Sequence, residues 1–212
     1  MFLRLEKHGG ISYHKIETLM EFMPMDVQST PLDGVVVLTP RRFGDNRGWF
    51  SETWNAQTLA DAGFAINFVQ DNHSFSAQIG TLRGLHYQRP PHAQDKLVRC
   101  TRGAIFDVAV DIRRGSPTFG QWTSAELSAE NGCQLLVPKG FLHGFMTLTA
   151  DCEVQYKCSD LYAPDCDGAV LWNDPKIGVA WPLDIAPVLS AKDQAALPLD
   201  AMDNPFVWEG AP

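Results

Sequence analysis

The sequence predicts an all-β protein, an antiparallel sandwich or barrel with a few short peripheral helices. Short stretches in which apolar and polar residues alternate recur along the chain. Turn sequences separate these stretches, and few segments show the periodicity of a helix. The turns are clearest at residues 114–117 (RGSP), 138–140 (PKG) and 163–165 (APD).

We expect a single domain over residues 33–212, preceded by an extension or arm over residues 1–32. The chain has 212 residues, 45% of them hydrophobic, which is enough for one sizeable core. It contains no internal repeat and no low-complexity linker. Residues 1–32 are irregular and rich in methionine, and no element is assigned to them.

The first part of the domain predicts a strand, a turn and a short helix. Residues 34–40 (GVVVLTP) form a strand that a proline closes. Residues 41–55 contain the turn GDNRG, followed by aromatic residues. Residues 55–63 predict a short helix ended by a glycine, and residues 64–76 return to extended structure.

Two later segments alternate most clearly. In residues 104–112, five apolar side chains alternate with four others that include two aspartates, which predicts a strand with one apolar face. Residues 152–159 alternate in the same way, with Tyr156 on the apolar face. In the tail, only residues 191–196 predict a short helix.

The stretch at residues 81–96 (TLRGLHYQRPPHAQDK) has an unusual density of side chains that bind anions or move protons. It has too few apolar residues for an ordinary core strand. We interpret it as the end of one strand, a turn at Pro90-Pro91 and the start of another strand. His86 and Lys96 then lie near the mouth of a site.

His86 is a candidate general base, although a histidine on a strand is more often structural. Neutral imidazole has a pKa near the working pH, and Gly84 leaves open space on the same face. Strict alternation places Arg83 and His86 on opposite faces of the strand. Both reach one site only if a bulge forms near Gly84.

Two other side chains have both an ordinary and a chemical interpretation, and a third has only an ordinary one. Lys96 is either an exposed lysine at a strand start or a donor to a ketone oxygen that gains negative charge. A buried tyrosine such as Tyr156 usually bonds a backbone carbonyl, but opposite a histidine it can deliver a proton to a carbanion. Asp193, taken alone, is a surface carboxylate.

Charge and cysteine content limit the partners. A net charge of −8 disfavours nucleic acid and anionic membranes. Residues 83–114 nevertheless hold seven basic and three acidic side chains, which suits either a small anionic ligand such as a phosphate ester or a solvated face. Five cysteines without a CxxC pair predict buried free thiols in a reducing compartment. With no signal peptide and no apolar run of membrane-spanning length, a cytoplasmic location is expected.

Residues 138–143 (PKGFLH) match PxGxxH, the second motif of the cupin jelly roll. In metal-binding cupins this histidine is a ligand, together with an earlier HxH pair and a glutamate. The chain has no HxH pair, so a three-ligand metal site is incomplete. We therefore expect His143 to orient other groups in the site.

Taken together, ordered segments over residues 34–197 resemble the dTDP-4-dehydrorhamnose 3,5-epimerase family of the cupin superfamily. The resemblance implies a cupin-type antiparallel jelly roll, a homodimer, no cofactor and no metal. The matching segments are FGDNRGWFSE (43–52), FVQDNHS (68–74), LRGLHYQ (82–88), KLVRC (96–100), GAIFDVAVDIRRGSPTFGQW (103–122), PKGFLHGF (138–145), VQYKCSDLYAP (154–164), LWNDP (171–175) and LSAKD (189–193).

The resemblance also implies roles for individual residues. His86 matches the catalytic base, Asp193 the carboxylate of its dyad, Lys96 the lysine beside the C4 oxygen and Tyr156 the opposing acid. The implied reaction is epimerisation of dTDP-4-keto-6-deoxyglucose at C3 and C5 to dTDP-4-keto-L-rhamnose. The implied substrate-binding residues are Arg47 and Arg83 at the diphosphate, Glu52, Gln70, Asn72 and His143 at other ligand positions, and Tyr162 near the thymine.

Three alternatives remain open from the sequence. A relative that inverts only C3 or only C5 shares His86 and Tyr156. A sugar-nucleotide-binding cupin without activity is disfavoured by the intact set of four catalytic positions. A metal-dependent cupin oxygenase or isomerase requires a metal that elemental analysis would detect.

Overall fold

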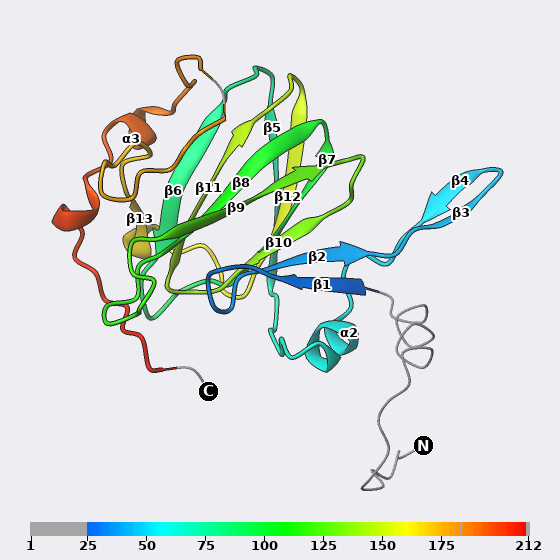
Figure 1. Ribbon diagram of the computed structural model, residues 1–212, viewed down its shortest axis with the longest axis horizontal. Coiled ribbons are helices and arrows are strands. Elements are labelled where there is room, and N and C mark those ends of the chain that lie inside the picture. The colour runs from blue at the N-terminus through cyan, green and yellow to red at the C-terminus, as the bar shows by residue number, and fades with distance from the viewer. Residues whose placement is uncertain (1–24, 183, 211–212) are drawn as a thin grey trace, which may run out of the picture.

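The computed structural model of the protein describes residues 25–182 and 184–210 (Figure 1), and its architecture is two antiparallel sheets packed face to face. In spatial order, the six-stranded sheet consists of β1 (Met25–Ser29), β2 (Val36–Pro40), β10 (Gln134–Val137), β7 (Lys96–Arg102), β12 (Cys152–Cys158) and β5 (Gln70–Ser76). The five-stranded sheet consists of β13 (Asp167–Ala169), β6 (Leu82–Gln88), β11 (Phe141–Thr147), β8 (Ala104–Asp111) and β9 (Trp122–Ser128).

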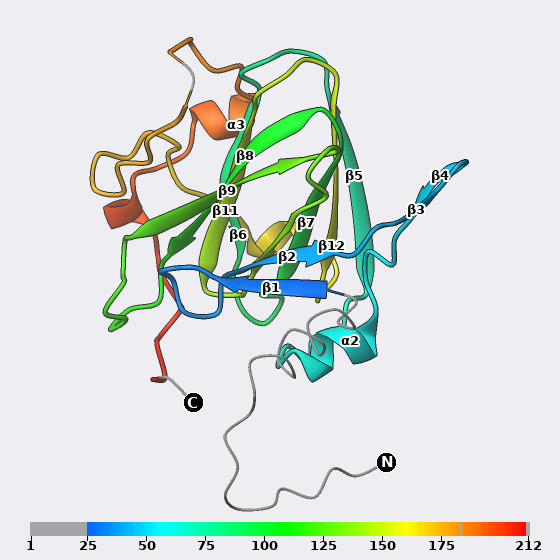
Figure 2. The same ribbon diagram turned by 45° about the vertical axis from the view of Figure 1, so that its right-hand side comes forward.

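A short hairpin, two short helices and two 3₁₀ turns lie outside the two sheets in the described residues. Strands β3 (Phe43–Asp45) and β4 (Gly48–Phe50) form a separate hairpin, which Figures 1 and 2 show projecting from the sandwich on the side away from α3. Among residues 25–182 and 184–210, the helices are α2 (Ala56–Asp61) and α3 (Ala191–Gln194), with 3₁₀ turns at η1 (Pro164–Cys166) and η2 (Leu199–Ala201). Within the described residues, no helix is long and apolar enough to cross a membrane.

The all-β prediction and its clearest strands are confirmed. The predicted strands 34–40, 104–112 and 152–159 appear as β2, β8 and β12. The predicted helix at 55–63 is α2, which begins after Asn55 because that side chain accepts the N–H groups of the first turn. The hairpin carries the predicted GDNRG turn, and α3 lies within the helix predicted at 191–196.

The predicted N-terminal arm can be compared with the structure only over its last residues. Residues 1–24 of the expected arm lie outside the described residues. Residues 25–29, which the sequence left unassigned, form β1 and pair with β2 in an antiparallel register from Met25–Pro40 to Ser29–Val36. The six-stranded sheet therefore begins inside the segment expected to be an arm.

Strand β8 differs from the expectation of one apolar face. Ile105 and Ala109 face the core between the sheets, whereas Val108 and Val110 pack beneath the C-terminal segment on the outer side. Even Asp107 is fully buried. Both faces of this strand are covered because residues 170–206 pack across the outer face of the five-stranded sheet.

Strand β6 contains the bulge that the sequence analysis required. His86 pairs with His143 and Arg83 pairs with Phe145, so two residues of β6 stand opposite the single Gly144 of β11. Gly84 has a φ of +140°, and a Cβ atom there would lie 2.6 Å from the Gly144 Cα. Glycine is required at this position for both reasons. The expectation that Gly84 leaves open space is wrong, because Gly144 fills that space.

We predict that Gly84→Ala destabilises the fold by about 3 kcal/mol or more, because backbone strain and overpacking add. Gly48→Ala is the matched control, since Gly48 has a φ of +132° but a Cβ atom added there would meet nothing within 4 Å. That control is expected to lose only about 1 kcal/mol. Urea denaturation measures both, and equal losses would contradict the role given to close packing.

Candidate active site

A cavity of about 370 Å³ brings together six of the residues that the sequence singled out. Its walls come from both sheets and from the segment that includes α3. The six residues are Arg83 and His86 on β6, Lys96 on β7, His143 on β11, Tyr156 on β12 and Asp193 on α3.

His86 and Asp193 form a hydrogen-bonded dyad at one wall of this cavity. The His86 Nε2 lies 2.5 Å from the Asp193 Oδ1. The other carboxylate oxygen accepts the Ser190 hydroxyl at 2.9 Å, and Ser190 also caps α3 by accepting the Asp193 N–H. With Nε2 donating to a fixed carboxylate, Nδ1 is the nitrogen that keeps a lone pair.

The dyad combines a neutral base with a charged orienting group. Burial lowers the pKa of His86, although the hydrogen bond and charge of Asp193 act in the opposite direction. Burial tends to raise the pKa of Asp193, but the hydrogen bonds from His86 and Ser190 outweigh it and the net shift is downward. At neutral pH the imidazole is therefore free to accept a proton while the carboxylate remains ionised.

Lys96 and Tyr156 lie on the six-stranded sheet, opposite the wall that carries His86. Burial lowers the pKa of the Lys96 ammonium, and the charges of Cys158, Asp167 and Asp107 oppose that shift. Burial also raises the pKa of Tyr156. Its phenol is therefore protonated at neutral pH and can donate a proton.

His143 and Asp107 form a second histidine–carboxylate pair beside the first. The His143 Nε2 lies 2.8 Å from the Asp107 Oδ1, and both side chains are buried. The second Asp107 oxygen has no hydrogen-bond partner among the described residues, and burial raises the pKa of this carboxyl. Because His143 pairs directly with His86 across β11 and β6, the two imidazoles are cross-strand neighbours.

Of the implied binding residues, Arg83 and His143 line the cavity, whereas three others lie outside its lining. The Arg83 guanidinium, which lines the cavity, donates to the Phe75 carbonyl at 3.0 Å, and this bond holds it against β5. Gln70 donates to the Asn72 side chain at 3.1 Å and accepts the Tyr162 N–H at 2.9 Å. Gln70, Asn72 and Tyr162 do not line the cavity itself.

The sequence analysis missed two residues, one that lines the cavity and one that is paired with it. Lys192 lines the cavity and forms an ion pair with Asp167 on β13. The same carboxylate accepts the Tyr162 hydroxyl at 3.3 Å. Lys192 had a signal, since it directly precedes Asp193 in LSAKD, whereas nothing near Asp167 in the sequence marks it.

Arg47 and Glu52 lie outside the cavity of their own chain. Arg47 is at the turn of the β3–β4 hairpin, where it pairs with Asp45 and its side chain is 85% exposed. Glu52 is exposed just after β4. Their predicted contacts with a diphosphate-containing ligand remain predictions.

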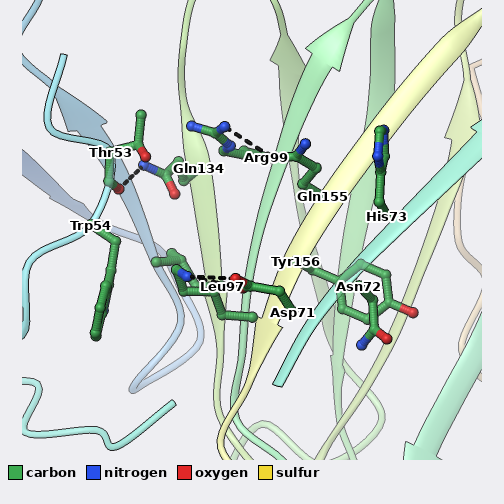
Figure 3. A pocket seen from close by; sticks show the side chains of 11 residues that line it. Thr53, Trp54, Asp71, Asn72, His73, Leu97, Arg99, Gln134, Gln155 and Tyr156 are labelled. Atoms are coloured by element: carbon green, nitrogen blue, oxygen red, sulfur yellow. Dashed lines mark hydrogen bonds and ion pairs between the residues drawn. The ribbon is translucent and has the colours of Figure 1, made fainter. Parts of the chain in front are cut away.

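A second cavity, of about 340 Å³, lies against the six-stranded sheet (Figure 3). Figure 3 shows Arg99 bonded to Gln155 and Gln134 bonded to the Thr53 carbonyl. Tyr156 lines both cavities, but none of His86, Lys96 or Asp193 lines the second. The dyad and the lysine therefore belong to the first cavity alone.

The described part of the chain offers no evident metal centre. Among these residues, no cluster of three or more histidine, cysteine or acidic side chains could hold a metal ion. His143, the residue of the cupin motif, is instead bonded to Asp107. That His143 orients other groups in the site stays a prediction.

Fold and site together define a cupin-type jelly roll whose barrel holds a histidine–carboxylate dyad opposite a tyrosine and a lysine. A family model described as dTDP-4-dehydrorhamnose 3,5-epimerase matches residues 29–201. The chain belongs to this family.

Individual relatives agree with that assignment. The chain is 55% identical to a dTDP-4-dehydrorhamnose 3,5-epimerase of Sinorhizobium fredii, over 82% of this chain and 90% of the relative. A Legionella pneumophila epimerase solved with dTDP-4-keto-L-rhamnose has a TM-score of 0.84 at 43% identity, covering 88% of this chain and all of that one. A 3′-monoepimerase of Streptomyces bikiniensis solved with dTDP-quinovose has a TM-score of 0.76 at 37% identity, covering 82% and 87%.

We predict that Asp193→Asn lowers the pKa of His86 further, because Asp193 is the group that raises it against burial. The imidazole then stays neutral to a lower pH than in the unaltered protein. An NMR titration of the His86 ring protons measures the shift. Asp107→Asn serves as the control, since Asp107 orients His143 rather than His86. A His86 pKa that rises or stays constant in Asp193→Asn would contradict the dyad.

Proposed function

We propose that this protein epimerises dTDP-4-keto-6-deoxyglucose at C3 and C5, giving dTDP-4-keto-L-rhamnose for deoxysugar biosynthesis. The observation that carries the proposal is the single cavity in which the His86–Asp193 dyad faces Tyr156 and Lys96. Family membership supplies the substrate class, since the matching relatives are named as epimerases of this sugar nucleotide.

The proposed mechanism follows from the ketone at C4, which acidifies the hydrogens on C3 and C5. His86 removes one of these protons through Nδ1, and the electron pair moves to the C4 oxygen. Lys96 stabilises the enolate charge there. Tyr156 then returns a proton to carbon from the other side, and proton exchange restores both groups.

The sandwich supports inversion because base and acid are on different sheets. His86 is on β6 of the five-stranded sheet, and Tyr156 is on β12 of the six-stranded sheet. A planar enolate bound between them presents one face to each group. Removal of a proton on one face and delivery on the other inverts the carbon.

The second candidate is a single-centre epimerase, and the resemblance to the Streptomyces bikiniensis 3′-monoepimerase favours it. Sequence identity favours the double epimerase, at 55% against 37%. The dyad, lysine and tyrosine serve either reaction, so these four residues do not distinguish the two candidates.

We propose further that the protein acts as a homodimer in which the β3–β4 hairpin reaches the partner's cavity. The hairpin projects from the sandwich, and its Phe43, Trp49 and Phe50 are 52%, 59% and 70% exposed. Arg47 and Glu52, both expected at the ligand, lie outside their own cavity. A second copy would both cover the aromatic residues and receive the two polar ones.

We also propose a cytoplasmic location, which is supported by five free cysteines.

Proton exchange tests the proposed reaction most directly. The protein is incubated with dTDP-4-keto-6-deoxyglucose in D₂O, and NMR follows the hydrogens on C3 and C5. Exchange with inversion at both carbons supports the double epimerase. Exchange with inversion at one carbon supports the second candidate, and no exchange despite ligand binding overturns both.

We predict that His86→Ala lowers turnover by at least about 10²- to 10⁴-fold, the usual effect of losing a positioned base. The matched control is His73→Ala. His73 is an exposed histidine on β5, where it pairs with Glu153 of the neighbouring strand β12. That variant should keep its turnover. A His86→Ala turnover within a few-fold of the unaltered protein would show that the base is another group.

We predict that mixing subunits of Arg47→Ala and His86→Ala restores activity that neither variant has alone. If the hairpin acts in the partner's cavity, each mixed dimer has one site with both native residues. Random mixing then gives about one quarter of full activity. Activity after mixing, with light scattering for the dimer mass, measures this. Failure to recover activity in proven mixed dimers would place Arg47 in its own subunit's site.

A further inference from the structure

The backbone of residues 161–163, which connect β12 to η1, is held by two glutamine side chains from opposite sheets. We call this segment the Tyr162 segment. Gln88, at the end of β6, donates to the Leu161 carbonyl at 3.1 Å and accepts the Ala163 N–H at 2.9 Å. Gln70, at the start of β5, accepts the Tyr162 N–H at 2.9 Å. Three successive residues are thus fixed through their main chain.

Gln88 is the more deeply placed of these two anchors. Its side chain is buried, and its amide also donates to the His92 carbonyl at 2.6 Å. Its own backbone pairs with Asp167 on β13. Gln88 does not line the catalytic cavity, although His86 lies two residues earlier on the same strand. Its polar atoms are therefore committed to holding neighbouring backbone, not to the reacting groups.

The side chains of the Tyr162 segment are exposed, although its backbone is held in place. Leu161 and Tyr162 are 59% and 58% exposed. The Tyr162 hydroxyl donates to Asp167, which also pairs with the cavity residue Lys192. The backbone is thus fixed, and it holds an exposed aromatic ring near the cavity. Such a ring can stack on a flat ligand group at a low entropic cost, because the backbone that carries the ring is already ordered before the ligand binds.

We propose that Gln88 is a positioning residue that sets the affinity for the nucleotide base through Tyr162 and takes no part in proton transfer. This inference rests on the proposed function, because a nucleotide base is the flat group that such a substrate carries. The hydrogen bonds of Gln88 fix the distance between the Tyr162 ring and the cavity. Without them, the ring must be ordered by the ligand itself, and base affinity falls.

The test compares two probes, dTDP and inorganic pyrophosphate, by isothermal calorimetry on Gln88→Met. Methionine keeps the length of the side chain and removes all three hydrogen bonds. We expect the Kd for dTDP to rise by about 10-fold or more, as the loss of several hydrogen bonds predicts. Pyrophosphate has no base, so its Kd should change by less than about twofold, and kcat at saturating substrate should stay within about threefold.

Gln134→Met is the matched control. Gln134 is also buried and also donates to a backbone carbonyl, that of Thr53 at 2.6 Å, but it lines the second cavity and not the catalytic one. It should lower thermal stability without changing either Kd. If Gln88→Met does not fold, Gln88→Glu retains the acceptor for Ala163 and should give a smaller rise in the dTDP Kd.

A double-mutant cycle with Tyr162→Ala decides whether Gln88 acts through the ring. The two losses in dTDP affinity should be strongly non-additive. Additive losses, equal weakening of dTDP and pyrophosphate, or a fall in kcat with an unchanged dTDP Kd would each overturn the role given to Gln88. If the unaltered protein binds no dTDP, the proposed function itself fails, which is a separate outcome.

Discussion

The hydrogen bond between His86 and Asp193 is the contact on which the site depends, since it joins residues 107 positions apart. The carboxylate is carried by α3, a helix of only four residues that has no stability of its own. Backbone bonds fix the chain on both sides of it. Val188 exchanges hydrogen bonds with Gly80 and Leu82, and Leu197 accepts the Leu171 N–H at 2.9 Å. The orientation of the His86 imidazole is therefore set by how the C-terminal segment docks on the five-stranded sheet.

The two sheets impose the second constraint, because His86 and Tyr156 lie on facing walls of the cavity, one on each sheet. The bulge at Gly84 turns Arg83 and His86 toward one cavity, and close contact with Gly144 keeps β6 and β11 together at that point. His143, held by the buried Asp107, lies directly beside His86. Two histidine–carboxylate pairs thus organise this polar interior, His86 with Asp193 and His143 with Asp107.

The sequence predicted much of this, and its omissions have physical causes. Alternation identified β8 and β12 because it is a local property. It could not show that both faces of β8 are buried, since the cover comes from residues 170–206. Strand β1 was missed because MDVQS is short and only its first residue is buried. The dyad was identified by resemblance, whereas the Asp167–Lys192 pair depends on a contact between distant segments that no local pattern encodes.

The position of Asp193 in the chain also orders events during synthesis. Every strand of both sheets precedes it among the described residues, since β13 ends at Ala169. The sandwich can therefore assemble on the ribosome while His86 has no carboxylate beside it. Only when α3 emerges and docks does the His86 imidazole gain its carboxylate partner, so a nascent barrel has its walls before it has the dyad.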